Sequence, residues 1–371
     1  MLNTEQKMLN GLKEVKLEVD MLKVPRDTNF TKWLEKYLVE DKQVMEPTAY
    51  NDMTNLERFI EKKRLGMDRP LDAFELMLKA NGIKASGPKT SRIKNFFEST
   101  TQRILWPEFI SQTIYAKMME KDLVAILIPN TEVIEGWEYT KMFLEDTALT
   151  RKMGAIAPGE KVPETKIKVA EYSSNVKKYG RRLKYTYEQI ANKTLGMFTS
   201  MVLQRIADQL KLDRTARAIE VLTSGDGGLD GLPSANIVET ENTTLINKDD
   251  IIAFASSTDA QYQINQFVAT TIQMRKWWSV LSTFSNPESQ KKEIGVPIPN
   301  GNRWDGDNLT SDYLLGLDPS KAALWVTNDD AIMEESWKLI DTQEAETVIT
   351  VRGDVTIIDR YAISALDINH S

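Results

Sequence analysis

Residues 166–228 read KIKVAEYSSNVKKYGRRLKYTYEQIANKTLGMFTSMVLQRIADQLKLDRTARAIEVLTSGDGG, and they contain the strongest secondary-structure signals in the chain. Apolar and polar residues alternate over 166–172, and 176–185 is also strand-like, which predicts two β-strands. After them, apolar residues recur at near-helical spacing until the glycine-rich end that begins at Ser224. If the part from 197 to 222 is continuous, it forms a helix about 39 Å long. A helix of that length can form the backbone of a domain.

The residues before this stretch predict a long two-stranded arm. Residues 137–148 are followed by MGAIAPGEKVPE at 153–164, whose glycines and prolines mark an exposed turn. The strand at 166–172 then returns. Upstream, residues 106–134 combine a helical stretch with the apolar run 123–128, which Pro129 ends.

The first 100 residues predict short helices joined by breaks. Their apolar positions are Met8, Leu12, Val15, Val19 and Leu22 in the first, Phe30, Leu34, Tyr37 and Leu38 in the second, and Leu56, Phe59 and Ile60 in the third. The first set is a coiled-coil-like stripe that stops before Pro25. A fourth helix is better signalled, with Asp68 as its cap, Pro70 in its first turn and Gly82 at its end. A basic linker, KASGPKTSR at 84–92, follows.

After residue 229 the chain alternates helices and strands, which predicts a compact α/β-like domain. The expected elements are a helix near 249–256, a strand at 266–269, a helix carrying Trp277 and Trp278, a loop at 285–312, a strand at 322–327 and a helix from about Asp329. The last segments, TVITV and VTIID, flank Arg352-Gly353-Asp354 and predict a hairpin-like pair.

The composition excludes several classes of protein. The 371 residues contain no cysteine, so disulfides and thiolate metal sites are absent. No apolar run reaches the length of a membrane span, and the first residues lack the plan of a signal peptide, so we expect a cytosolic origin and no membrane partner. The net charge of −7 argues against a general nucleic-acid binder.

The charge is unevenly distributed along the chain. Residues 141–185 hold eleven Lys and Arg against five Asp and Glu, whereas residues 226–346 hold eight against twenty. The basic segment of one copy can attract the acidic segment of another copy. Two charged surfaces that only face solvent explain the pattern equally well.

No catalytic constellation emerges from the residue types. The only histidine, His370, lies next to the end of the sequence, which argues against a Ser-His-Asp triad. The acidic pairs Asp249-Asp250 and Asp329-Asp330 begin predicted helices, where carboxylates suit the helix dipole. We therefore predict no enzyme, no cofactor and no metal site.

Three further motifs have a structural interpretation that we prefer. SGDGGLDG at 224–231 follows a helix end and lacks GK[ST], which favours a helix terminator over a phosphate loop. Asp305, Asp307 and Asp312 resemble a calcium loop only superficially, since Thr310 and Gly316 occupy its glycine and glutamate positions. Trp277 and Trp278 are expected to be one core and one interface residue rather than a stacking platform.

The order of these elements resembles that of the major capsid proteins of tailed phages, which have the Hong Kong 97 fold. The segments that carry the resemblance, over residues 100–371, are WPEFI, GWEYTKMFLED, KVAEYSSNVKKYGRRLKYTYEQI, TSGDGGLDGLPSA, AALWVTNDDAIM and TVITVRGDVTIIDRYAISAL. The resemblance implies an α+β fold with an N-terminal arm, an E-loop β-hairpin, a P domain with a spine helix, and an inserted A domain.

The family order implies six parts of the chain. They are an N-terminal helical extension at 1–100, the N-terminal arm at 101–135, the E loop at 136–175, the P domain with its spine helix at 176–228, the A domain at 229–342 and the P-domain return strands at 343–371. In some relatives such an extension is a scaffolding region removed by a protease. Here we expect it to be retained.

The resemblance implies a subunit of an icosahedral virion shell that encloses double-stranded DNA without sequence-specific binding. It implies hexamers and pentamers of the same chain, and separate scaffolding, portal or decoration proteins. The alternatives are an encapsulin-like compartment that loads a cargo enzyme, and a soluble enzyme of another type.

The basic E loop is the part that we expect to contact a neighbour. Its candidate contact residues are Lys161, Lys166, Lys168, Lys177 and Lys178, which we expect to face acidic surface of an adjacent subunit. Some relatives crosslink an E-loop lysine to an asparagine with help from a glutamate. No residue of this chain matches that trio.

Overall fold

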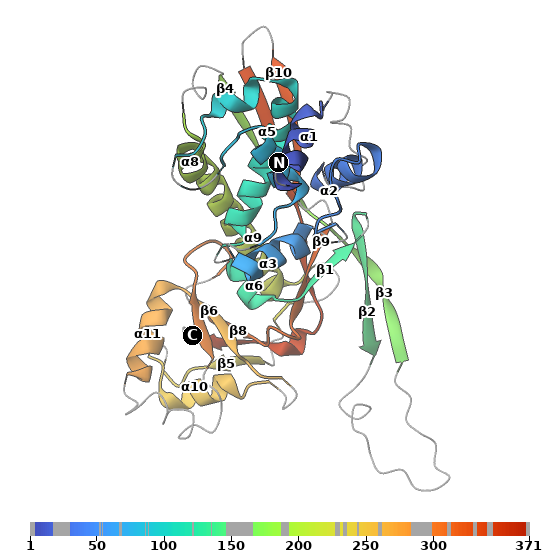
Figure 1. Ribbon diagram of the computed structural model, residues 1–371. Helices are drawn as coiled ribbons and strands as arrows, with labels where there is room; N and C mark the ends of the chain where they lie inside the picture. The colour runs from blue at the N-terminus through green and yellow to red at the C-terminus, as the bar shows by residue number, and fades with distance from the viewer. Residues whose placement is uncertain are drawn as a thin grey trace, which may run out of the picture. The chain divides into compact units, whose positions relative to one another are not determined.

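The structure is a computed structural model, and Figure 1 shows its helices and strands in chain order. The residues that it describes are 4–17, 30–51, 53, 55–66, 69–85, 87, 89–120, 122–134, 136–145, 166–186, 193–226, 231–232, 236–242, 245–258, 262–282, 299–309, 313–328, 332–339 and 344–368. Within these ranges, no helix is both long enough and apolar enough to cross a membrane.

The chain forms two compact units, each assembled from three separate segments. Unit 1 consists of Met1–Asp122, Lys178–Lys211 and Asn328–Gly353. Unit 2 consists of Leu123–Lys177, Leu212–Thr327 and Asp354–Ser371. Residues that are distant in sequence therefore share one core in each unit.

Unit 1 begins with a series of helices, which include the four short ones that the sequence predicted in the first 100 residues. They are α1 (Thr4–Glu14), α2 (Phe30–Lys36), the π-helical turn η2 (Tyr37–Asp41), α3 (Asn55–Leu65), α4 (Ala73–Ala80), the 3₁₀ turn η4 (Ile93–Phe97) and α5 (Thr100–Met118). Leu12 and Val15 of the predicted coiled-coil stripe are buried, and its later members lie outside the described residues.

The start of α4 differs from the prediction by four residues. Asp72, rather than Asp68, is the N-cap, and its carboxylate accepts the backbone N–H of Glu75 at 2.8 Å. The Glu75 carboxylate in turn accepts the N–H of Asp72, which completes a capping box. Pro70 therefore precedes the helix instead of occupying its first turn, and Asp68 lies outside the described residues.

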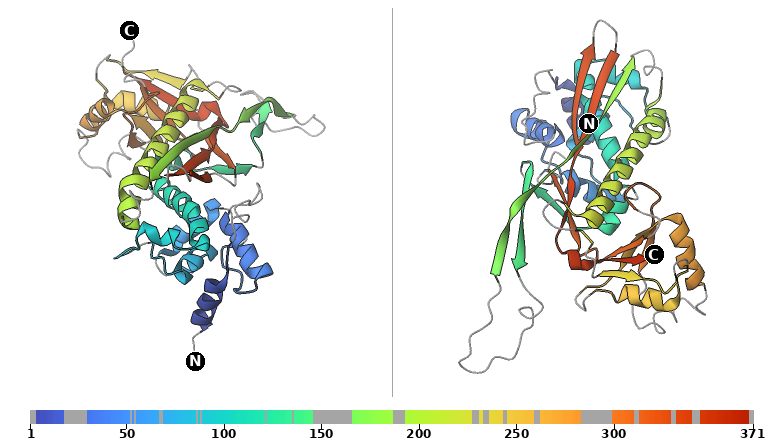
Figure 2. Two further views of the ribbon diagram at one scale, coloured as in Figure 1. Left: turned by 90° about the horizontal axis from the view of Figure 1, so that it is seen from above. Right: turned by 180° about the vertical axis from the view of Figure 1, so that it is seen from behind.

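Three strands form the sheet of unit 1. They are β4 (Lys178–Thr186), β10 (Ile332–Leu339) and β11 (Glu344–Arg352), in the order β10-β11-β4, and both pairings are antiparallel. Figure 2 shows them side by side. The predicted helix from about Asp329 is therefore wrong, because the residues after it form β10 and pair with β11.

The long predicted helix is present. It comprises α8 (Leu195–Phe198), the π-helical turn η5 (Thr199–Leu203) and α9 (Gln204–Ser224), so the helical backbone runs without a break from Leu195 to Ser224. Thr194 caps its start by accepting the N–H of Met197. The two units divide inside α9, and the helix contributes residues to both cores.

Unit 2 contains two sheets, a two-stranded ribbon and short helices. The five-stranded sheet has the order β5 (Ile237–Glu239), β13 (Ile363–Asp367), β8 (Tyr313–Leu317), β6 (Gln266–Ala269) and β7 (Asn300–Arg303). The three-stranded sheet has the order β1 (Thr131–Ile134), β9 (Ala323–Asn328) and β12 (Asp354–Ile357). The ribbon pairs β2 (Glu138–Glu145) with β3 (Lys166–Asn175), and the helices are α6 (Leu123–Leu127), α10 (Lys248–Ala255) and α11 (Thr271–Leu281).

The prediction for the last segments needs correction. TVITV and VTIID do not pair with each other: the first lies in β11, whereas the second overlaps β12, which pairs with β9. In the apolar run 123–128, Leu123–Leu127 form the short helix α6. The predicted helix near 249–256, the strand at 266–269 and the helix carrying Trp277 are all confirmed.

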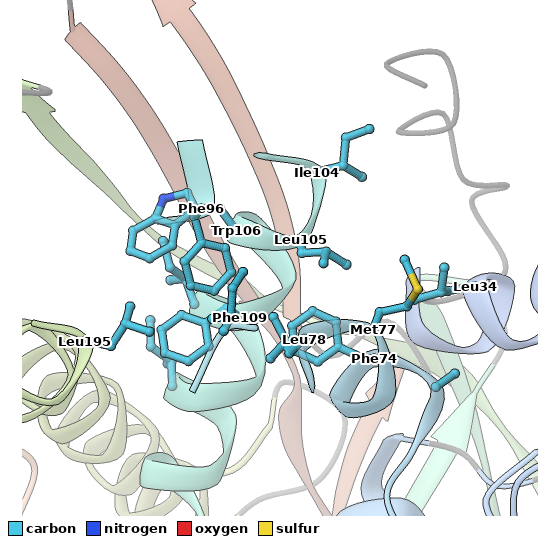
Figure 3. Close-up of a cluster of buried hydrophobic side chains, with 14 of the residues drawn as sticks. Leu34, Phe74, Met77, Leu78, Phe96, Ile104, Leu105, Trp106, Phe109 and Leu195 are labelled. Atoms are coloured by element: carbon cyan, nitrogen blue, oxygen red, sulfur yellow. The ribbon is translucent and has the colours of Figure 1, made fainter. Parts of the chain in front are cut away.

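The described residues form one apolar cluster in unit 1 and two in unit 2. In unit 1, residues of the N-terminal helices share one cluster with α5, with the start of the long helix and with Ile349 and Val351 of β11. Figure 3 shows part of it, where Phe74, Met77 and Leu78 of α4 lie near α5. In unit 2, Phe254, Phe267 and Trp277 pack with tilted or edge-on rings at 4.6–6.5 Å.

Candidate assembly surfaces

The predicted arm is present as the ribbon of β2 and β3. The strands pair antiparallel from Glu138 opposite Asn175 to Glu145 opposite Lys166, with an irregularity between Thr140 and Met142. Among the described strands, the ribbon has no third member. A two-stranded ribbon is marginally stable by itself in water, so an arm of this kind gains most from lying on another surface.

The structure places the five predicted lysines unequally. Lys166 and Lys168 lie in β3, where their backbone partners are Glu145 and Phe143, and Lys161 lies outside the described residues. Lys177 and Lys178 are exposed at the junction between β3 and β4.

Lys177 already has an acidic neighbour in its own chain. Hydrogen bonding to Arg217 lowers the pKa of Glu220, and the positive charge of Lys177 lowers it further. The prediction that Lys177 faces the acidic surface of another subunit is therefore weaker than the prediction for the strand lysines.

The base of the arm carries a half-exposed tryptophan. Val176 donates its N–H to the carbonyl of Trp137 at 2.9 Å, while the Trp137 side chain is 49% exposed. Next to it, the Tyr139 hydroxyl donates to Glu132 at 2.8 Å. Burial and this hydrogen bond raise the pKa of Tyr139 to about 12. The backbone closes the base of the arm, and about half of the Trp137 side chain is exposed to solvent.

One aromatic cluster fixes the core of unit 1. Trp106, from the WPEFI segment, is 2% exposed and donates its indole N–H to the Tyr185 hydroxyl at 2.7 Å. Its ring lies 5.0–5.8 Å from those of Phe96, Phe109 and Phe198, and Figure 3 shows Trp106 beside Phe96 and Phe109. The contact joins α5 to the end of β4, two segments whose pairing the sequence did not indicate.

Buried polar groups tie the N-terminal helices to α5. Glu108 accepts hydrogen bonds from the Thr31 hydroxyl and, at 2.8 Å, from the Gln112 amide. Burial raises the pKa of Glu108, although these two hydrogen bonds act in the opposite direction. The Thr101 hydroxyl accepts the backbone N–H of Leu17 at 3.1 Å. The extension is thus held by specific partners as well as by apolar packing.

A second buried polar group lies within the extension. Arg58 and Glu35 are almost fully buried and form an ion pair at 3.6 Å. Glu35 also accepts the N–H of Thr48, and Arg58 donates to the carbonyls of Asn51 and Met53. An ion pair this deeply buried is costly to break from one side.

The SGDGGLDG segment ends the long helix and anchors it. Asp226 accepts hydrogen bonds from the Thr356 hydroxyl at 2.9 Å and from the N–H of Ile357 at 3.1 Å. Gly225 has a φ of +93°, and a Cβ at Gly231 would lie 2.5 Å from the carbonyl carbon of Thr223. The segment is a helix terminator, as the sequence indicated.

An ion pair joins the side of the same helix to Asp354 at the start of β12. Arg217 donates two hydrogen bonds to Asp354, at 2.9 and 3.1 Å, and a third to Glu220. The sequence marked Asp354 only as a turn residue. Its partner lies 137 positions away, and no local pattern identifies such a pair.

The acidic and aromatic residues that the sequence analysis considered as candidate sites have structural roles. Asp250 forms a capping box with Asn247 at the start of α10. Asp305 accepts the N–H and hydroxyl of Thr271 at the start of α11, and these bonds lower the pKa of Asp305 to about 2. Trp277 is 1% exposed, whereas Trp278 is 61% exposed, so one ring belongs to the core and the other to the surface. His370 and Asp312 lie outside the described residues.

No protein-family model matches this sequence, and no curated protein does either. Solved structures do resemble it. A phage-related protein from Bordetella bronchiseptica RB50 has a TM-score of 0.50 at 9% identity, over 71% of this chain and 96% of that one. The capsid of an empty GTA particle has a TM-score of 0.45 at 11% identity, over 67% and 90%. The SrpI encapsulin of Synechococcus elongatus PCC 7942 has a TM-score of 0.44 at 11% identity, over 67% and 88%.

These likenesses concern the fold. The match to the phage-related protein covers nearly all of that chain, and the succession of ribbon, long helix, inserted sheet and returning strands is the one predicted from sequence. The chain therefore has the Hong Kong 97-type α+β fold.

Proposed function

We propose that this chain is a major capsid protein whose copies assemble into the icosahedral shell of a phage. The observation that carries the proposal is the β2–β3 ribbon, which has the fold's E-loop position but no third strand among those described in its own chain. A neighbouring copy supplies the surface that such a ribbon needs. The phage-related protein from Bordetella supports the same reading through its fold.

The proposal assigns roles to the parts of the chain. The E loop covers 136–175, the N-terminal arm 101–135, and the P domain contains β4, the long helix and β11. The A domain covers 229–342 and the return strands cover 343–371 in this proposal. Within these ranges β10 pairs with β11, and β13 pairs with β8 of the five-stranded sheet.

The proposed partners are other copies of the chain, in hexamers and pentamers. Scaffolding, portal and decoration proteins complete a virion that assembles in the host cytoplasm and encloses double-stranded DNA without reading its sequence. The chain has a structural role and no enzymatic one in this proposal.

The test is assembly of the purified full chain. We expect closed shells or capsomers by negative-stain microscopy and sedimentation velocity, with a scaffolding partner where one is required. A matched variant replaces residues 146–165 by Asn-Gly, which keeps β2 and β3 but shortens the arm. That variant should remain folded and fail to close shells.

A concentration-independent monomer, even with a scaffolding partner, would contradict the proposed function. A shell that forms equally well with the shortened arm would contradict the role of the arm and leave the shell function in place. An enzyme found inside purified shells in place of nucleic acid would instead identify a cargo compartment.

A further inference from the structure

The basic linker after α4 lies against the start of the long helix. Ser91 closes the loop by exchanging hydrogen bonds of 2.9 Å with Lys84. Ile93 donates its N–H to the carbonyl of Lys193 at 3.0 Å, and Leu195 donates to Ser91 at 2.9 Å. Two segments about 100 residues apart in sequence are therefore joined edge to edge.

Five exposed cations of unit 1 lie on the backbone of this junction. They are Lys84, Lys89, Arg92, Lys94 and Lys193. Because neighbouring Cα atoms are 3.8 Å apart, the hydrogen bonds from Ser91 and Ile93 bring all five within a short span of backbone. We call these five residues the basic patch.

Buried side chains and a hydrogen bond fix the backbone that carries the patch. Ile93, Phe96 and Leu195 alternate with the cations in sequence and are fully buried. The Gly196 N–H donates to the Thr90 hydroxyl at 3.1 Å. The backbone under the cations is thus fixed, while their side chains extend into solvent.

The segment that carries most of the patch has an excess of positive charge. Residues 82–103 contain five Lys and Arg but one Asp or Glu, in a protein whose net charge is −7. Neutral donors, Thr90 and Asn95, lie among the cations. Lysine, arginine and short polar side chains are the groups that contact phosphates without reading bases. A surface with this excess of positive charge attracts a polyanion.

We propose that the basic patch binds the phosphate backbone of double-stranded DNA inside the shell. The proposal rests on the proposed capsid function and adds to it a specific internal contact. Each lysine or arginine that neutralises a phosphate releases counterions, so the binding is weak for one subunit and is repeated over the shell.

The experiment measures binding of a fluorescent duplex of about 20 base pairs to the unassembled full chain at several salt concentrations. The test variant carries Lys89→Gln, Arg92→Gln, Lys94→Gln and Lys193→Gln. The control carries Lys7→Gln, Lys13→Gln, Lys16→Gln and Lys63→Gln, which remove the same charge from exposed positions of unit 1. A polyglutamic acid peptide is the second probe.

We expect the test variant to bind the duplex about tenfold or more weakly, and the slope of log Kd against log salt to decrease by about 0.9 for each phosphate that the variant no longer neutralises. The control should bind like the wild type. Equal decreases in affinity in both variants, or no decrease in either, would overturn the proposal.

A different partner would also be recognised. If the test variant loses binding to polyglutamic acid but keeps binding to the duplex, the patch faces acidic protein surface, and the DNA proposal fails. Shell assembly is scored separately for every variant. If the test variant forms normal shells and binds the duplex as tightly as the wild type, the patch does not bind DNA. The proposed function would then still stand.

Discussion

The N-terminal extension and the β2–β3 arm are both additions to the central fold, but they are stabilised in opposite ways. The extension shares a core with α5 and β11 and contributes buried polar partners such as Thr31. The arm is a ribbon of two strands that pair with each other and with no third strand among those described. The extension is therefore a part of the folded subunit, whereas the arm depends on what lies next to it.

The comparison also bears on processing. A segment that a protease removes leaves the rest of the chain folded only if few contacts cross the cut. Here Leu34 and Met77 lie in the same cluster as Phe109 and Val351. Removal would expose that surface to water, at about 25 cal/mol for each Å² of apolar area. Retention of the extension is consistent with this packing.

The largest expected effect is that of deleting residues 1–90. Unit 1 should lose its cooperative unfolding, because the deletion removes a large share of its core, while unit 2 keeps its fold. Hydrogen exchange with mass spectrometry resolves the two units separately. A deletion variant that forms wild-type particles would show that the extension is dispensable.

Next in size is the effect of Trp106→Ala. Loss of a buried tryptophan that packs against four phenylalanines should cost about 3–5 kcal/mol in the free energy of unfolding. Tyr185→Phe removes only the hydrogen-bond acceptor for its indole N–H and should cost about 1 kcal/mol. Urea unfolding of both variants measures the two losses in the free energy of unfolding. Equal losses would mean that the packing of the Trp106 ring contributes little to stability.

A smaller effect is expected for Glu108→Gln. Because burial raises the pKa of Glu108, its contribution to stability is fully present below the unfolded value of about 4.3 and is lost as pH rises through the folded pKa. The glutamine variant should therefore lose less stability than the wild type between pH 4 and neutral pH. Thermal midpoints at several pH values test this, and parallel pH curves would contradict it.

The smallest effect on folding is expected in the arm. Replacing Lys161, Lys166 and Lys168 by Glu should leave the helical circular dichroism of the monomer unchanged, yet slow assembly at low salt. Exposed ion pairs are worth about 0.2–1 kcal/mol each and are screened by salt, but every interface repeats them. Lys7, Lys13 and Lys16 changed to Glu form the control. If the arm variant assembles at the wild-type rate, the charge is only a solvated surface.

Sequence reasoning succeeded where local signals decide structure. The strand at 266–269, the long helix and the two strands of the arm follow from periodicity and from glycine or proline at their ends. Sequence reasoning failed where the neighbouring strand determines the secondary structure. The residues of β10 have an acid-rich, helix-like composition, but pairing with β11 overrides that preference.

The same limit applies to the ends of β11 and β12. Two β-branched runs around Arg352-Gly353-Asp354 have the local appearance of a hairpin, but they enter different sheets. Among the candidate contact residues, only the backbone placement of Lys166 and Lys168 and the exposure of Lys177 and Lys178 follow from the structure. An interface between copies depends on a second chain, which one sequence does not describe.

The segmented construction of unit 1 has a consequence for synthesis. Its core joins α5, complete by residue 118, to Ile349 and Val351 of β11. A ribosome that adds roughly 5–20 residues per second needs on the order of 10–50 s to make the intervening chain. During that interval the first helices carry apolar surface without its final cover. The nascent chain is therefore prone to aggregation during that interval, unless the helices of the extension pair early or a chaperone binds them.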